Sequence, residues 1–107
     1  MMKLLSRSEE IVLITILKLK DNAYGVAIRK KLHEETGTKW SFGSIYTALN
    51  TLTRKRYVEK RRGEPTAERG GRHKCLYAVT SEGKRALKEI KNVQERLWSD
   101  LKAIALD

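Results

Sequence analysis

The stretch WSFGSIYTALNTLTRKR, residues 40–56, decides the fold. Its apolar residues recur at the i, i+3, i+4, i+7 spacing of a helix that packs one face on a core, namely Ile45, Ala48, Leu49 and Leu52. Ser41 stands just before this pattern, where its hydroxyl can accept a backbone N–H of the first turn. We therefore predict a helix over residues 41–56 with one buried face.

The opposite face of this helix is unusual because it carries no acidic residue. At about 100° per residue, it presents Gly43, Thr47, Asn50 and Arg54, flanked by Tyr46 and Thr51. Hydroxyl, amide and guanidinium groups hydrogen-bond phosphates and base edges, whereas a solvated face normally mixes Glu with Lys. The pattern indicates a recognition helix for the major groove, although an ordinary amphipathic helix with a Thr-rich exterior would look the same.

Length and composition limit the class of protein. The chain has 107 residues, of which 40% are hydrophobic and 34% charged, as expected for one small folded unit. Its apolar runs fall short of the roughly 20 residues that span a bilayer, and residues 1–10 lack the pattern of a secretory signal. The single cysteine, Cys75, excludes an internal disulfide and suits a reducing compartment. We expect a cytoplasmic protein that does not enter the membrane.

The charge is strongly positive and unevenly distributed. The net charge of +10 predicts a polyanionic partner, with nucleic acid ahead of an anionic membrane surface. Residues 54–74 hold nine Lys and Arg against three Glu. This basic segment directly follows the candidate recognition helix, where it could track a phosphate backbone.

The segment before the recognition helix has the pattern of two further helices. Ser6 and Glu9 form a capping box ahead of the apolar run 11–19, which is apolar enough to need a cover on most sides, a second subunit included. A second helix is predicted over residues 23–35, capped by Asp21 or Asn22 and ended by Gly37. Gly25 lowers helix propensity there by roughly 1 kcal/mol, which predicts close approach of another backbone. A short turn then joins this helix to the next, which is a helix-turn-helix arrangement.

The segment after the recognition helix changes to the pattern of strands. Residues 57–62 and 72–79 are predicted strands, and residues 63–71, with Pro65 and the Gly70-Gly71 pair, are a predicted loop. Cys75, Tyr77 and Val79 share one face of the second strand. A basic two-stranded ribbon behind a recognition helix is a wing, here residues 57–79.

The last segment is predicted to be a long helix that pairs two subunits. Thr80 caps it, and it runs over residues 81–106. Its later apolar residues are spaced by 3.5 on average, the spacing of a coiled-coil seam; they are Ile90, Val93, Leu97, Leu101 and Ile104. We predict a DNA-binding unit over residues 1–79 and a dimerisation helix over residues 80–107.

Together these segments resemble the PadR-like family of transcriptional regulators from bacteria and archaea. The similarity rests on Ala23-Tyr24-Gly25, on the pattern from Phe42 to Leu52, on Tyr57-Val58, on Gly70-Gly71-Arg72 and on the pattern from Tyr77 to Gly83. The resemblance implies a mainly α winged helix-turn-helix repressor with a two-stranded β wing. It also implies a homodimer held by the last helix, and contact between operator DNA, Tyr46 and the wing.

The predicted site residues fall into three groups. The DNA-binding set comprises Ser41, Gly43, Ser44, Tyr46, Thr47, Asn50, Arg54, Arg61, Arg62, Arg69, Arg72 and Lys74. The dimer set is the seam named above. Trp98, beside that seam, is interpreted either as a packing aromatic or as a platform on which a planar aromatic effector stacks. Trp40 is predicted to pack rather than to stack on a base.

Other functions find less support in the residues. His73 and Cys75 could face one side of a strand as metal or redox groups, but two ligands are too few for a site. We recognise no nucleophile-base set and no phosphate-binding Gly-rich loop, so we predict no catalysis, cofactor or metal. Two rivals stay open: a regulator whose main task is to sense a drug or phenolic compound, and a winged-helix module that binds an acidic protein.

Overall fold

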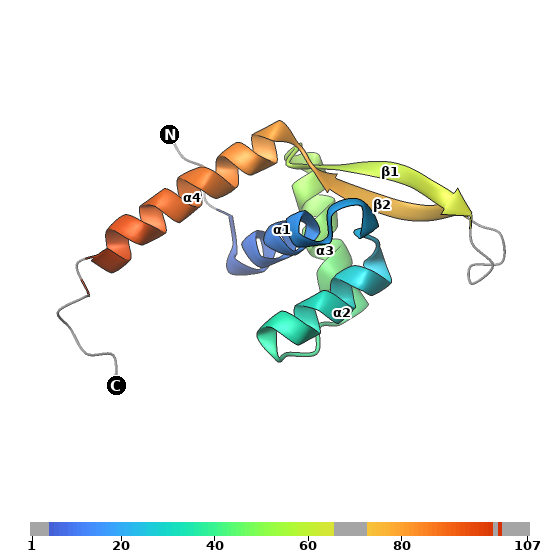
Figure 1. The fold of residues 1–107 in the computed structure, drawn as a ribbon, viewed down its shortest axis with the longest axis horizontal. Coiled ribbons are helices and arrows are strands. Elements are labelled where there is room, and N and C mark those ends of the chain that lie inside the picture. The colour runs from blue at the N-terminus through green and yellow to red at the C-terminus, as the bar shows by residue number, and fades with distance from the viewer. Residues whose placement is uncertain (1–4, 66–72, 100, 102–107) are drawn as a thin grey trace.

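The computed structural model describes residues 5–65, 73–99 and 101. Its elements, in chain order, are α1 (Arg7–Leu19), the 3-10 turn η1 (Lys20–Asn22), α2 (Gly25–Thr36), α3 (Phe42–Arg54), β1 (Val58–Pro65), β2 (His73–Val79) and α4 (Ser81–Ser99). The predicted winged helix-turn-helix is confirmed. In Figure 1 the strand pair projects to one side of the helical body and α4 runs out toward the other.

Helix α1 is the central helix of the body. The predicted capping box is formed, because the Glu9 N–H donates to Ser6 Oγ at 3.1 Å and the Ser6 N–H donates to Glu9 Oε1 at 3.3 Å. Val12 and Leu13 are fully buried between the other helices. Ile14 and Leu17, on another side of the same helix, stay exposed. The rest of the described chain therefore covers α1 only in part.

Helix α2 starts later than the sequence indicated. The prediction of a cap at Asp21 or Asn22 is wrong, since these residues lie in η1 and the residue before α2 is Tyr24, which makes no side-chain cap bond. The carbonyl of Ala23 instead accepts the N–H of Tyr77 in β2 at 2.8 Å. This bond holds the chain extended up to Gly25. The other end is as predicted, with Gly37 at φ 70°.

Helix α3 confirms the predicted stripe and cap, but it ends at Arg54 rather than at the predicted residue 56. The Oγ of Ser41 accepts the N–H of Ser44 at 3.0 Å, so Ser41 is the cap. The four apolar positions of its stripe are all buried, and they pack with residues of α1 and α2 in one core. One face of α3 is thus held rigidly and the other is left at the surface.

The wing is an antiparallel pair of strands. Val58 pairs with Val79 and Arg62 with Cys75, and the register shifts between Arg62 and Pro65. The prediction that a loop begins at Gly63 is wrong, because this shift lets the pairing continue to Pro65 opposite His73. Tyr77 is buried in the core, so the base of the wing is part of the helical body.

Helix α4 begins at the predicted cap. Thr80 Oγ1 accepts the Gly83 N–H at 3.0 Å and donates to the Arg56 carbonyl at 2.7 Å. The described helix ends at Ser99 rather than continuing through Leu101, which lies in a turn, and residues 102–107 fall outside the described residues. Within the described ranges, no helix is both long and apolar enough to cross a bilayer.

Candidate nucleic-acid interface

The outer face of α3 presents the predicted recognition residues together. All of the predicted recognition residues here are exposed, namely Ser41, which caps the helix, and Gly43, Ser44, Tyr46, Thr47, Asn50 and Arg54. The hydroxyls at the start of the helix are already engaged, since Ser41 Oγ donates to Ser44 Oγ at 2.9 Å. Thr47 and Asn50 sit between that start and Arg54, so they form the centre of the face.

A groove beside this face adds hydroxyls that the sequence reasoning missed. It has a volume of about 470 Å³ and is lined by Ser6, Ser8, Glu9, Gly43, Ser44, Thr47, Ala48 and Thr51. Ser6 and Ser8 belong to the start of α1, more than thirty residues before α3. No local pattern signals this neighbourhood, because it arises only when α1 packs across α3.

Glu9 is the acidic residue of the groove, and its charge is compensated. Its Oε1 lies 3.0 Å from Lys55 Nζ. Partial burial by itself raises the pKa of Glu9, but the hydrogen bonds from Lys55 and from the Ser6 backbone outweigh burial and lower the pKa below its ordinary value. Glu9 therefore stays ionised and paired, which limits its repulsion of a phosphate.

An aromatic pair lies on the other side of the α3 face. Phe42 and Tyr46 are 39% and 42% exposed, with ring centroids 6.3 Å apart. A Cβ built on Gly25 would meet the Tyr46 hydroxyl. The prediction that another backbone approaches Gly25 is therefore wrong, because the neighbour is a side chain of the recognition helix.

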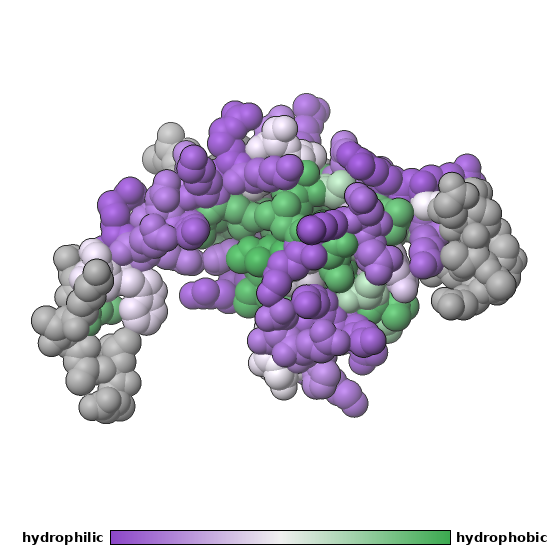
Figure 2. All heavy atoms as spheres, viewed as in Figure 1, coloured by the Kyte–Doolittle hydropathy of each residue, from purple (hydrophilic) through white to green (hydrophobic). Residues whose placement is uncertain are grey.

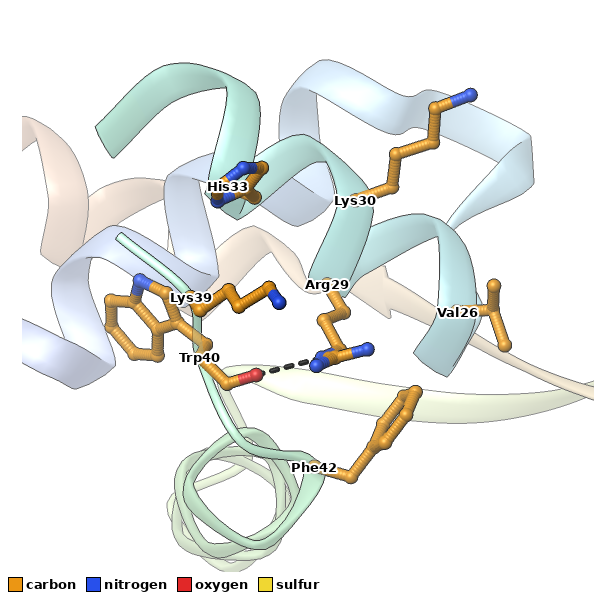
Figure 3. Close-up of a pocket in the computed structure, with 7 residues that line it drawn as sticks. All are labelled: Val26, Arg29, Lys30, His33, Lys39, Trp40 and Phe42. Carbon is orange, nitrogen blue, oxygen red and sulfur yellow. Dashed lines mark hydrogen bonds between the residues drawn. The ribbon is translucent and has the colours of Figure 1, made fainter. Parts of the chain in front are cut away.

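A small basic pocket continues from this aromatic pair (Figure 3). It has a volume of about 210 Å³ and is lined by Val26, Arg29, Lys30, His33, Lys39, Trp40 and Phe42. Arg29 Nε donates to the Trp40 carbonyl at 2.7 Å, and its guanidinium carbon lies 4.8 Å from the Phe42 ring centroid. Trp40 packs against the core, as predicted. Lys30 and Lys39 extend the positive surface, which the sequence reasoning missed.

The wing carries the remaining predicted DNA-binding residues. Arg61 and Arg62 are exposed on β1, and Arg61 Nη2 lies 2.7 Å from Glu59 Oε1. Lys74 Nζ lies 4.1 Å from the centroid of the Tyr24 ring, where it joins β2 to the segment before α2. Arg69 and Arg72 lie outside the described residues.

The base of the wing holds two titratable groups, Cys75 and Tyr77. Burial, followed by a hydrogen bond with Cys75, raises the pKa of Tyr77, so its phenol stays neutral. Cys75 is a free, exposed thiol. Within the described part of the chain, no cluster of three or more His, Cys, Asp or Glu could hold a metal ion.

The predicted dimer seam is covered unevenly by its own protomer. Ile90 is buried and Val93 and Leu101 are half-buried, whereas Leu97 is 67% exposed. Ile104 lies outside the described residues. Figure 2 shows hydrophobic surface in the region of α1, between α4 and α2. Ile14 and Leu17 are the exposed large hydrophobic residues of α1.

Trp98 borders a pocket between α1 and α4. The pocket has a volume of about 380 Å³ and is lined by Leu5, Arg7, Glu10, Ile90, Gln94, Leu97 and Trp98. Trp98 is 57% exposed. Gln94 Nε2 donates to both carboxylate oxygens of the buried Glu10, at 3.1 and 2.9 Å. This contact holds α4 against α1.

Comparison with known proteins places these features in a family. The model of the transcriptional regulator PadR-like family matches residues 13–89. A PadR family transcription regulator from Clostridium difficile R20291 is 31% identical, with 87% of this chain and 92% of that chain covered and a TM-score of 0.67. A PadR-like transcriptional regulator from Bacillus cereus strain ATCC 14579 is 22% identical, with coverage of 92% and 91% and a TM-score of 0.74. No curated protein matches the sequence significantly.

Proposed function

Because the chain belongs to the PadR-like family of transcriptional regulators, we propose that it is a cytoplasmic repressor that binds operator DNA as a homodimer. The observation that carries the proposal is the outer face of α3. This face is exposed and free of acidic residues, and a fully buried stripe holds it from behind. A rigid helix with hydroxyl, amide and guanidinium groups on its outer side suits the major groove.

The centre and the edges of this face take different roles. The Asn50 amide can pair with N6 and N7 of adenine, and the Thr47 methyl and hydroxyl beside it can contact a neighbouring base. Tyr46 and Arg54 lie at the edges, where they contact phosphates. The hydroxyls of the groove between α1 and α3 take a further phosphate, since serine hydroxyls commonly serve that purpose.

The wing and the basic pocket supply affinity without sequence preference. Arg61, Arg62 and Lys74 lie on the two strands, and Arg69 and Arg72 belong to the same basic segment. Lys30 and Lys39 line the pocket beside Phe42, the first residue of α3. Phosphate contacts of this kind release counterions and make binding depend steeply on salt.

Dimerisation uses the apolar surface that one protomer leaves open. Ile14 and Leu17 of α1, with Leu97 and Trp98 of α4, are large exposed hydrophobic side chains. Exposed apolar patches mark interfaces. A second copy of the chain that covers this patch would place the two α3 helices symmetrically, as a palindromic operator requires. The half-sites would lie about one DNA turn apart, roughly 34 Å.

The pocket beside Trp98 favours a second role, the sensing of a planar aromatic effector. The indole is exposed at a pocket whose lining is partly apolar and partly polar. Its other apolar residues are Leu5, Ile90 and Leu97, and its polar residues are Arg7, Glu10 and Gln94. A ligand stacked there would alter how two α4 helices pack and so the spacing of the α3 helices. Trp98 fluorescence in Trp40→Phe protein, titrated with planar aromatic compounds, tests this role. Absence of quenching across a varied panel, with DNA affinity unchanged, leaves Trp98 as a packing residue.

Selection from a random duplex pool tests the proposed function. The wild-type protein is expected to enrich one palindromic sequence, and gel shifts should show it bound as a dimer with much higher affinity than random DNA. Equal affinity for all duplexes would overturn sequence-specific recognition. Failure to bind any duplex, with binding to an acidic protein, would make the chain a winged-helix interaction module.

A further inference from the structure

Gly25 is a glycine whose own backbone does not require one. It is the first residue of α2, and its φ is not positive. Alanine is accommodated by such a backbone and favours a helix more than glycine, by about 1 kcal/mol in a helix interior. The reason for glycine must therefore lie in what surrounds its Cα.

The nearest neighbour of the Gly25 Cα, outside its own stretch of chain, is the side chain of Tyr46. A Cβ at Gly25 would overlap the Tyr46 hydroxyl and lie 3.2 Å from its Cζ and 3.9 Å from its Cε2. Gly83 differs, because a Cβ there would meet the backbone carbonyl of Tyr57 and approach Val79 Cγ1 at 2.8 Å. At Gly83 the backbone itself excludes a side chain. At Gly25 the nearest obstacle is the far end of a half-exposed tyrosine.

Gly25 and Phe42 together determine where the Tyr46 ring lies. The Phe42 ring stacks beside it with an interplanar angle of 28°, and the hydroxyl rests on the bare Cα of Gly25. Tyr46 lies one residue before Thr47 on the recognition helix and is 42% exposed. A Cβ at Gly25 would turn the phenol away from this place without disturbing the core.

The chain around Gly25 is also fastened to the wing. The Ala23 carbonyl accepts the Tyr77 N–H, Tyr24 forms a single β-bridge with Leu76, and Lys74 lies over the Tyr24 ring. These contacts all join the segment before α2 to β2. The place at which Tyr46 rests is therefore set by the wing as well as by α2.

We propose that Gly25 is a positioning residue for DNA recognition. Its bare Cα leaves room for the Tyr46 hydroxyl. The contacts of the preceding residues, Ala23 and Tyr24, with β2 keep that hydroxyl in a constant position relative to the wing. The phosphate contact of Tyr46 and the contacts of the wing then meet the duplex in one register. This inference rests on the proposed function, because it assigns a purpose within DNA binding.

A double-mutant cycle tests whether Gly25 positions the Tyr46 hydroxyl. Wild-type protein, Gly25→Ala, Tyr46→Phe and the double variant are compared for affinity to the selected operator and for Tm. Gly25→Ala should lower operator affinity about tenfold, the worth of one hydrogen bond to a charged group, with Tm unchanged or higher. The same substitution should have no further effect in the Tyr46→Phe background, because the hydroxyl that it would displace is absent. Gly83→Ala is the control, and it should lower Tm.

Three outcomes would overturn the positioning role of Gly25. The first is wild-type affinity in Gly25→Ala, and the second is an equal loss of affinity in both backgrounds, which would mean that Gly25 acts through the backbone. The third is a fall in Tm like that of Gly83→Ala, which would make Gly25 a packing glycine. Wild-type protein that binds no duplex would overturn the proposed function as well, so the two failures are distinguishable.

Discussion

Helices α3 and α4 both have one apolar face, but the protomer treats them differently. Every apolar residue of the α3 stripe is buried, whereas α4 is buried at Gly83, Ala86 and Ile90 and leaves Leu97 exposed farther along. The difference arises because α1 and α2 close over α3, while α4 runs out past the end of α1 (Figure 1). The comparison teaches that a similar pattern can build the core through one helix and leave an exposed apolar surface on another.

The largest effect is expected where the α3 stripe is broken. Leu49→Ala removes a fully buried side chain from the core and should cost about 2–5 kcal/mol of unfolding free energy. Asn50→Ala, one residue on and exposed, is the matched control and should leave stability nearly unchanged. Urea unfolding of both variants measures this. Similar losses in the two would show that the stripe is not what holds α3.

Breaking the α4 surface should separate subunits without unfolding them. Leu97→Asp places a charge in the proposed interface, so sedimentation should show monomers and specific DNA binding should be lost, with the helical circular dichroism retained. Asn92→Asp adds the same charge at another exposed position of α4 and should leave the dimer intact. A dimeric Leu97→Asp variant would remove this part of α4 from the interface.

The outer face of α3 is tested by its central amide. Asn50→Ala should weaken binding to the selected operator by about 1–3 kcal/mol and weaken binding to random DNA much less, because it removes a base contact. Gel-shift titrations on both duplexes give the two differences. Equal losses would assign Asn50 to the phosphate backbone.

Unlike the outer face of α3, the wing should contribute affinity for DNA but not sequence specificity. Arg62→Ala should weaken binding to all duplexes alike and reduce the slope of log K against log salt by about one. Arg61→Ala should have a smaller effect, since Arg61 is paired with Glu59. A changed base preference in the Arg62 variant would show that the wing reads sequence.

The smallest effect is expected for the ion pair between Glu9 of α1 and Lys55, the residue after α3. The pKa of Glu9 is lowered in the folded protein from its ordinary value of 4.5, so its ionised form stabilises the fold above that ordinary value. This contribution disappears as the pH falls through the lower, folded pKa. Glu9→Gln should therefore reduce Tm slightly at pH 7, and the difference from wild-type protein should shrink as the pH is lowered below the ordinary pKa of 4.5. Glu34→Gln, at an exposed site on α2, is the control, and a loss that persists in acid would point to packing instead.

The sequence alone predicted the features that depend on spacing within one element. The α3 stripe, the Ser6 and Glu9 capping box, the Ser41 and Thr80 caps and the left-handed Gly37 are all as expected. Each depends on residues at most a few positions apart, where helix geometry relates sequence to space directly. The same periodicity also predicted that the outer residues of α3 are exposed.

Only the tertiary structure decided what contacts these elements make. Ser6 and Ser8 line the groove beside α3. The Tyr77 N–H of β2 binds the Ala23 carbonyl, so that α2 begins only at Gly25. The Tyr46 hydroxyl lies against Gly25. The partners in these contacts are twenty or more residues apart, so their proximity depends on how whole helices and strands pack. The sequence indicated that Gly25 needed a close neighbour, but the packing of α2 against α3 determined that the neighbour is a side chain of the recognition helix.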